Sequence, residues 1–175
     1  MPADDYYHLS DADLGAVIAY LKSLPPVDSE QPDSSVGPLA RALNLAGQFP
    51  LFSAERIDHT GPRPTAPPAG PTAEYGKYLV SVGCAGCHGP GLSGGPVPSF
   101  PPDAPPALNL TSGGEMGVWS EADFFNAMRT GVNPAGRELD SEWMPWPAFK
   151  QLTDEELRAI WLHLQSVPAR EYGNR

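Results

Sequence analysis

The sequence predicts an all-α protein, in which a helical domain with long Pro/Gly-rich loops follows an isolated helix and a linker. Several segments place apolar residues three and four positions apart, as amphipathic helices do, and almost no segment alternates like a strand. Capping residues stand at the starts of these segments. The 175 residues include 22 prolines and 18 glycines, which indicates much irregular chain between the helices.

The first predicted helix covers residues 10–24. Ser10 is a favourable N-cap, and two aspartates follow it in the first turn. The helix ends at a pair of prolines, and its apolar stripe consists of Leu14, Val17, Ile18 and Leu21. A lone helix of this length is marginal in water, so we expect the stripe to pack on another surface.

The sequence divides into four parts. Residues 1–27 hold the isolated helix, and residues 28–71 read as a Pro-rich linker. One short helix is predicted inside the linker, from Leu39, Leu43 and Ala46. A domain follows at residues 72–170, with a short tail at 171–175.

Three helices are predicted in the domain. The first is capped by Thr72, the second runs from the cap Ser120 to Gly131, and the third begins with the capping box formed by Thr153 and Glu156. Between the first and second helices, residues 89–106 contain 4 glycines and 7 prolines, which predicts a loop without regular structure.

Both cysteines of the chain lie in one motif, Cys84-Ala85-Gly86-Cys87-His88. The C-x-x-C-H pattern is typical of c-type haem attachment, in which two thiols bind one porphyrin and the adjacent histidine binds its iron. A zinc site would need four ligands, and no second Cys/His pair follows at a suitable spacing. A thioredoxin-like dithiol would follow a strand, which this sequence does not predict. Haem attachment is therefore the preferred interpretation.

Composition narrows the classes of partner. The net charge of −10 argues against nucleic acid and anionic membrane surfaces, and favours a partner with a basic docking face. No apolar run approaches the roughly 18 residues that a membrane span needs. The first residues have neither the basic start nor the apolar run of a signal peptide.

These features together resemble a class I c-type cytochrome domain, and most closely the C-terminal domain of bacterial tandem, dihaem cytochromes. The resemblance covers the domain from end to end. It implies one covalent haem c bound through Cys84 and Cys87, electron transfer without enzyme activity, and a periplasmic or extracytoplasmic location, with membrane association only through a partner. The implied partners are redox proteins: a dehydrogenase subunit, other cytochromes or an oxidase.

The resemblance also implies His/Met ligation of the iron, with His88 as the proximal ligand. Met144, in the run Trp143-Met144-Pro145-Trp146, has the context that the family gives its sixth ligand. Met116 and Met128 are other methionines of the domain, and His59 and His163 are competing ligands. A vacant or displaceable sixth position would instead indicate a peroxidase-like haem enzyme or a ligand sensor.

The family places a proline carbonyl on the second ring nitrogen of the proximal histidine, which orients the ring. Pro106 is the expected residue, with Pro101 and Pro105 as alternatives. Side chains expected to hydrogen-bond the haem propionates are Asn109, Trp146, Trp119 and Arg137.

An internal repeat links the two ends of the chain. Aligned 143 positions apart, residues 1–25 and 144–168 share 9 identities, including a Met-Pro pair at the start and a proline at the end. The repeat predicts that residues 1–27 are the last helix of a preceding cytochrome domain, and that Met1 is the ligand of a haem which this chain does not carry.

Overall fold

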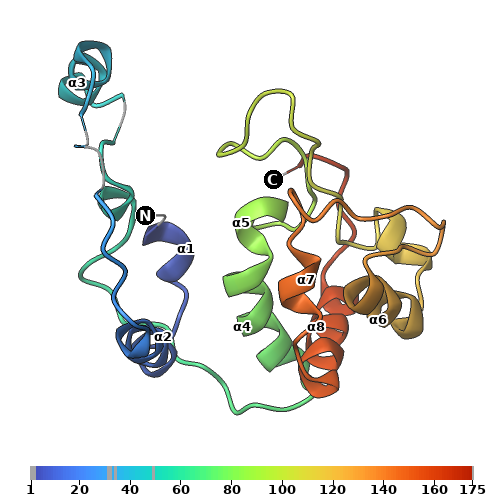
Figure 1. The fold of residues 1–175 in the computed structure, drawn as a ribbon. Coiled ribbons are helices and arrows are strands. Elements are labelled where there is room, and N and C mark those ends of the chain that lie inside the picture. Colours follow the sequence, from blue (N-terminus) through green and yellow to red (C-terminus); the bar gives the residue numbers. More distant parts are fainter. Residues whose placement is uncertain (1–2, 31–32, 34, 49, 175) are drawn as a thin grey trace. The chain divides into compact units, whose positions relative to one another are not determined.

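The computed structural model describes residues 3–30, 33, 35–48 and 50–174, and no β-strand occurs in these ranges. The predicted all-α class is confirmed (Figure 1). The chain forms two compact units, Met1–Thr65 and Ala66–Arg175, which we describe separately. Met1 and Pro2, which begin the predicted repeat, lie outside the described residues.

The described residues of the first unit form four helical segments. These are α1 (Ala3–Tyr6), α2 (Asp11–Ser23), α3 (Pro38–Leu45) and the 3-10 helix η1 (Ser53–Arg56). The predicted cap of α2 is confirmed, because the Ser10 hydroxyl accepts a hydrogen bond from the backbone N–H of Asp13 at 3.1 Å. α3 corresponds to the short helix expected within residues 28–71.

Much of the predicted linker belongs to this compact unit. The backbone N–H of Ala3 donates to Ser53 Oγ at 3.0 Å. The Arg63 guanidinium pairs with Asp11 at 3.0 Å and donates to the carbonyl of Leu9 at 3.2 Å. Composition alone suggested an extended spacer, but these contacts tie residues 53–63 back to the first two helices. The compact unit therefore extends to Thr65, and the predicted division at residue 27 stays a prediction.

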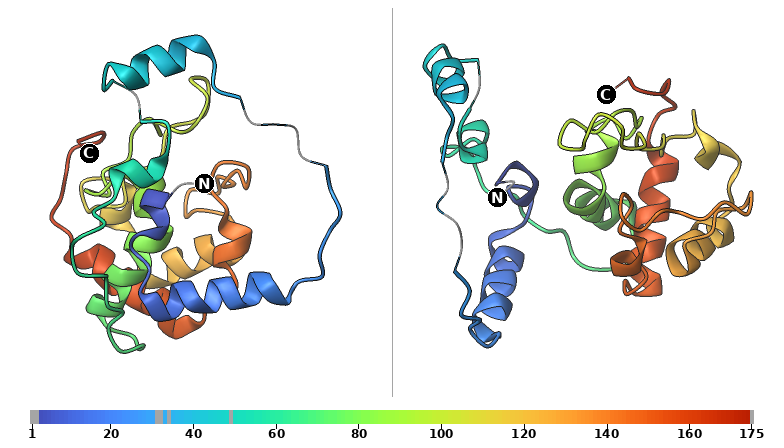
Figure 2. Two further views of the ribbon diagram at one scale, coloured as in Figure 1. Left: turned by 90° about the vertical axis from the view of Figure 1, so that its left-hand side faces the viewer. Right: turned by 45° about the horizontal axis from the view of Figure 1, so that its top comes forward.

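The second unit carries the haem motif. Its helices are α4 (Ala73–Gly83), α5 (Ala85–His88), η2 (Glu115–Val118), α6 (Glu121–Thr130), α7 (Trp146–Phe149) and α8 (Asp154–Ser166). Figures 1 and 2 show α4, in green, packed along α8, in red. The close approach requires a glycine, because a Cβ at Gly76 would collide with the backbone carbonyl of Ala159.

The predicted helix boundaries of this unit are confirmed by their caps. Thr72, Ser120 and Thr153 each accept a hydrogen bond from the backbone N–H three residues later, and the last two form capping boxes. Gly131 ends α6 with a φ of 73°, a left-handed conformation that glycine adopts without strain.

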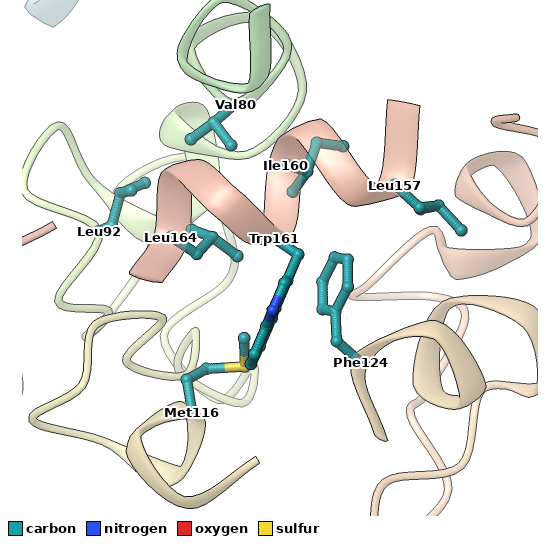
Figure 3. Packing of buried hydrophobic residues seen from close by; sticks show 8 residues of the cluster. All are labelled: Val80, Leu92, Met116, Phe124, Leu157, Ile160, Trp161 and Leu164. Carbon is teal, nitrogen blue, oxygen red and sulfur yellow. The ribbon is translucent and has the colours of Figure 1, made fainter. Parts of the chain in front are cut away.

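The core of the second unit lies between α4, α6 and α8 (Figure 3). The rings of Phe124 and Trp161 stack with centroids 5.7 Å apart, and Met116 extends toward the same indole. Val80 of α4 and Leu92 of the following loop pack near Leu164 of α8.

The loop after α5 is irregular, as predicted, but it is anchored. An isolated bridge joins Gly95 to Ala107, and the backbone N–H of Leu110 donates to the carbonyl of Leu92 at 2.8 Å. The hydroxyl of Ser93 donates to the carbonyl of Asn174 at 2.6 Å. The described part of the expected tail, residues 171–174, is therefore bound to this loop.

Candidate functional site

The second unit encloses a cavity of about 350 Å³, within the size range of small-molecule sites. Its wall is predominantly apolar. α4 and α5 contribute the motif residues, the loops 97–110 and 137–145, which we call the rim, contribute further lining residues, and the core helices contribute Phe124, Met128, Leu157, Ile160 and Leu164.

All three residues that define the motif line this cavity. Cys84 lies between α4 and α5, and the short helix α5 carries Cys87 and His88. Residues three and four positions apart share one face of a helical turn, so this local geometry directs the three side chains to the same cavity. The structure thus brings together the residues that the motif predicts to hold one haem.

The second nitrogen of His88 is held by a backbone carbonyl, as expected, but the carbonyl is that of Leu108. His88 is buried, and its Nδ1 lies 2.7 Å from the Leu108 oxygen. Since a carbonyl only accepts, Nδ1 carries the proton and Nε2 carries the lone pair that an iron ligand needs. Pro106 lines the cavity but does not make this contact, so that expectation was wrong.

The Cys84 thiol does not have the lowered pKa of a redox-active cysteine. Burial raises the pKa of the Cys84 thiol to about 12, and the neighbouring Cys87 adds to the shift. Catalytic dithiols have lowered thiol pKa values, because the thiolate is the reactive form. In the described part of the chain, no three His, Cys, Asp or Glu side chains gather as a metal site of the zinc type.

Three methionines line the cavity. Met116 is buried in the core beside Trp161, and Met128 belongs to α6, whose apolar side packs on the core. Met144 lies in a loop at the rim, where its backbone N–H donates to the carbonyl of Asp140 at 2.8 Å. The competing histidines, His59 of the first unit and His163 of α8, are not among the lining residues.

Trp146 does not line the cavity, contrary to the expectation that it binds a propionate. Its indole N–H, the only donor of this side chain, is used by the carbonyl of Leu139 at 3.0 Å. The ring also lies against Gly131, where a Cβ would clash with it. Trp146 therefore shapes the loop that carries Met144.

Asn109 lines the cavity, but its amide is engaged in the protein scaffold. The side-chain nitrogen donates to the carbonyl of Arg170 at 2.9 Å, and the side-chain oxygen accepts from the backbone and the hydroxyl of Thr111 at 2.9 and 2.8 Å. Its expected hydrogen bond to a propionate stays a prediction. Asn109 joins the loop that holds His88 to the segment after α8.

Arg137 and Trp119, the remaining propionate candidates, both line the cavity. Arg137 is paired with Glu115, whose two oxygens lie 3.0 and 3.1 Å from Nη2. Because Glu115 begins η2 and Arg137 lies in the loop after α6, the pair joins two segments of the cavity lining with neutralised charge. Glu138 and Asp140 add carboxylates to the lining.

Two features of the site were not predicted. The sequence does not show that the Leu108 carbonyl binds His88, because every residue carries a carbonyl. Only the path of the backbone decides which carbonyl reaches the ring. Phe100 and Trp143 meet across the rim with ring centroids 5.2 Å apart. The aromatic residues are visible in the sequence, but their pairing depends on how two irregular loops fold.

The residues present fit a covalently bound haem c. Two cysteines and a buried histidine share one apolar cavity with a methionine at its rim, and the histidine ring is oriented by a carbonyl, as iron-binding imidazoles usually are. A permanently attached porphyrin would cover the apolar wall that core helices leave open.

Comparison with known proteins supports this fit. Residues 73–168 match the family model described as Cytochrome c. The fructose dehydrogenase cytochrome subunit of Gluconobacter japonicus is 28% identical over 196 residues, and a diheme cytochrome c-type of Cereibacter sphaeroides is 28% identical over 192. Each alignment covers 97% of this chain. A nicotinate dehydrogenase subunit of Pseudomonas putida is 32% identical over 106 residues, 56% of the chain.

The chain spans only part of each of these relatives: 37% of the Gluconobacter protein, 59% of the Cereibacter protein and 9% of the Pseudomonas protein. Among the described helices of this chain, none combines the length and the apolar character that crossing a membrane demands.

Proposed function

The chain belongs to the cytochrome c family, whose members transfer electrons through covalently bound haem c, and we propose that this one holds one haem between His88 and Met144 and accepts electrons from a dehydrogenase. The observation that carries the proposal is the shared cavity, which Cys84, Cys87, His88 and Met144 all line.

The protein residues in this proposal have separate roles. The cysteines anchor the haem, which supplies an iron that alternates between the ferric and ferrous states. The Leu108 carbonyl keeps the His88 ring in the tautomer that binds iron. Met144 would hold the iron through its thioether, a ligand that favours ferrous iron and raises the reduction potential. With His88 and Met144 both holding the iron, the site would act as a carrier rather than an enzyme.

Replacement of Met144 tests the ligand assignment. In the haem-loaded Met144→Ala variant, we expect loss of the methionine-to-iron charge-transfer band, ready binding of carbon monoxide by the ferrous form, and a lower reduction potential within the ~0.8 V range that axial ligands span. Absorption spectra and a redox titration measure all three.

Met116→Leu and Met128→Leu are the matched controls, because both methionines line the same cavity. Each control is expected to keep the charge-transfer band. If a control loses the band and Met144→Ala keeps it, the assignment is wrong. Carbon monoxide binding by the unaltered ferrous protein would contradict carrier function and favour a haem enzyme or ligand sensor.

The dehydrogenase partner is proposed from two relatives named as dehydrogenase subunits and from the acidic balance of this chain. A net charge of −10 favours a donor with a basic docking face. Affinity purification from the native organism, followed by reduction of the ferric haem with the substrates of any dehydrogenase that copurifies, is the test. Copurification with a non-dehydrogenase donor alone would overturn this part of the proposal.

A further inference from the structure

Two buried polar side chains, Asn109 and Thr111, follow the carbonyl that holds His88. Asn109 is 6% exposed, and Thr111 is fully buried. The Asn109 side-chain oxygen accepts hydrogen bonds from the backbone N–H and the hydroxyl of Thr111, at 2.9 and 2.8 Å. Buried polar groups lower stability unless they are bonded, so a bonded network of this kind favours one backbone path. The pair therefore fixes the chain directly after Leu108.

The segment after α8, residues 170–174, completes this network. Arg170 binds both side chains through its backbone: its N–H donates to Thr111 Oγ1 at 3.1 Å, and its carbonyl accepts from Asn109 Nδ2 at 2.9 Å. The backbone N–H of Gly113 donates to the same hydroxyl at 3.2 Å. The Thr111 hydroxyl thus joins Asn109, Gly113 and the segment after α8.

The far end of this segment binds an earlier part of the same loop. The N–H of Gly173 donates to the carbonyl of Ser93 at 3.0 Å, and the Ser93 hydroxyl donates to the carbonyl of Asn174 at 2.6 Å. Residues 170–174 therefore hold the loop at two places, before and after Leu108 in the sequence.

The Leu108 carbonyl lies against Gly94, the residue that follows Ser93. Gly94 has a φ of 74°, and a Cβ at this position would collide with the Leu108 carbonyl. The N–H of Gly94 donates to the backbone carbonyl of His88 at 3.0 Å. Gly94 thus contacts both residues whose hydrogen bond orients the imidazole ring.

We propose that Asn109 and Thr111 are positioning residues for the proximal ligand. Through Arg170 they hold the Leu108 carbonyl on His88 Nδ1, and this hydrogen bond tunes the reduction potential of the haem. The inference rests on the proposed function in one respect, that His88 binds the iron, and it is independent of the sixth ligand.

A hydrogen bond at Nδ1 acts on the iron through the imidazole ring. The carbonyl attracts the Nδ1 proton, which makes Nε2 a more basic ligand and favours ferric iron. A looser hydrogen bond has the opposite effect, so the reduction potential rises. Thr111 is not among the residues that line the cavity, and its hydroxyl reaches the haem only through Asn109 and the backbone. A change at Thr111 therefore tests the positioning network without removing a lining side chain.

The experiment uses the complete chain loaded with haem and two substitutions of Thr111. Thr111→Val removes the hydroxyl with little change in volume, whereas Thr111→Ser keeps it. In Thr111→Val we expect a higher reduction potential and an exchange of the His88 ring N–H with solvent that is about two- to tenfold faster, the range that one lost hydrogen bond corresponds to. Thr111→Ser should retain both values. A redox titration and NMR of the ferrous protein measure them.

Two further variants act on the same network. Asn109→Ala breaks the contacts with Thr111 and Arg170, so both values should shift in the direction of Thr111→Val. Ser93→Ala releases only the contact with Asn174 and should cause a smaller shift in that direction. If Thr111→Val attaches no haem, Ser93→Ala supplies the test.

Asn133→Ala is the matched control. Asn133 is also a buried asparagine, at 3% exposure, and its side-chain oxygen also accepts from a backbone N–H, that of Arg137 at 2.8 Å. Its loop does not carry the carbonyl that binds His88. The control should leave the exchange of the His88 ring N–H unchanged.

Unchanged exchange and potential in Thr111→Val would overturn the inference, and so would equal changes in Thr111→Ser or Asn133→Ala. A shift confined to Asn109→Ala would overturn it in favour of a direct contact between that side chain and the haem. If the spectra of the unaltered protein show no iron-bound His88, the proposed function fails and the inference fails with it. A sixth ligand other than Met144 would change the proposed function alone.

Discussion

At the scale of single residues, the site depends on backbone groups as much as on side chains. The carbonyl of Leu108 orients His88 at 2.7 Å, and the carbonyl of Leu139 takes the indole N–H of Trp146 at 3.0 Å. In both cases a backbone carbonyl, which every residue carries, fixes the orientation of a functional side chain. Trp146 and Asn109 therefore position loops through their contacts with backbone carbonyls.

Phe100 and Trp143 make a testable contact at this scale. Their rings connect the loop after α5 with the loop that carries Met144, so the contact is expected to hold Met144 at the cavity. Aromatic pairs of this kind contribute about 0.5–1.5 kcal/mol. Phe100→Leu and Trp143→Leu should each speed carbon monoxide binding to the ferrous haem.

A double-mutant cycle separates this contact from other effects of the two substitutions. If the rings act as a pair, the double variant should bind carbon monoxide little faster than either single variant. Fully additive effects would show that the rings act independently.

At the scale of elements, the crossing of α4 and α8 organises the second unit. The absence of a side chain at Gly76 lets α4 approach the backbone of Ala159, and this approach brings the end of α4, with Cys84, to the wall formed by Leu157, Ile160 and Leu164. The glycine is thus part of the haem site although it does not line the cavity.

Two glycine-to-alanine substitutions are expected to have opposite effects. Gly76→Ala places a Cβ on the Ala159 carbonyl, and overpacking of this kind costs about 1–3 kcal/mol, more than the ~1 kcal/mol that alanine gains in a helix. Gly15→Ala in α2 meets open space and should stabilise that helix by about 0.5–1 kcal/mol. The melting temperature of the haem absorption band measures the stability of the second unit in Gly76→Ala. The rate of amide hydrogen exchange in α2 measures the stability of that helix in Gly15→Ala.

An equal or higher melting temperature of the haem band in Gly76→Ala would contradict the close crossing. Unchanged or faster exchange in Gly15→Ala would contradict the open environment of that residue.

At the scale of the whole molecule, charge is the property that a redox partner meets first. The chain carries a net charge of −10, and Glu138 and Asp140 add carboxylates to the cavity lining, whereas Arg137 is neutralised by Glu115. Such a field attracts cationic partners and repels anionic ones over about a Debye length.

Small redox complexes measure the sign of this field. Between about 0.01 and 0.1 M salt the Debye length shortens from about 30 to about 10 Å, so electron exchange with a cationic ruthenium hexaammine should slow and exchange with ferricyanide should speed up. Asp140→Asn should weaken both trends more than Glu155→Gln, which removes the same charge from the start of α8. Equal effects of the two variants would show that only net charge matters.

The sequence by itself determined the elements and the chemistry. Apolar spacing and caps such as Thr72, Ser120 and Thr153 act within a few residues, so they predicted the helices, and the Cys84 to His88 spacing predicted the haem motif because one helical turn fixes its geometry. Tertiary structure decided the rest: that residues 53–63 return to α1 and α2, that Leu108 and not Pro106 holds His88, and that Asn109 and Trp146 bind backbone. These outcomes depend on where irregular loops bring distant carbonyls together, and no local pattern of side chains encodes that path.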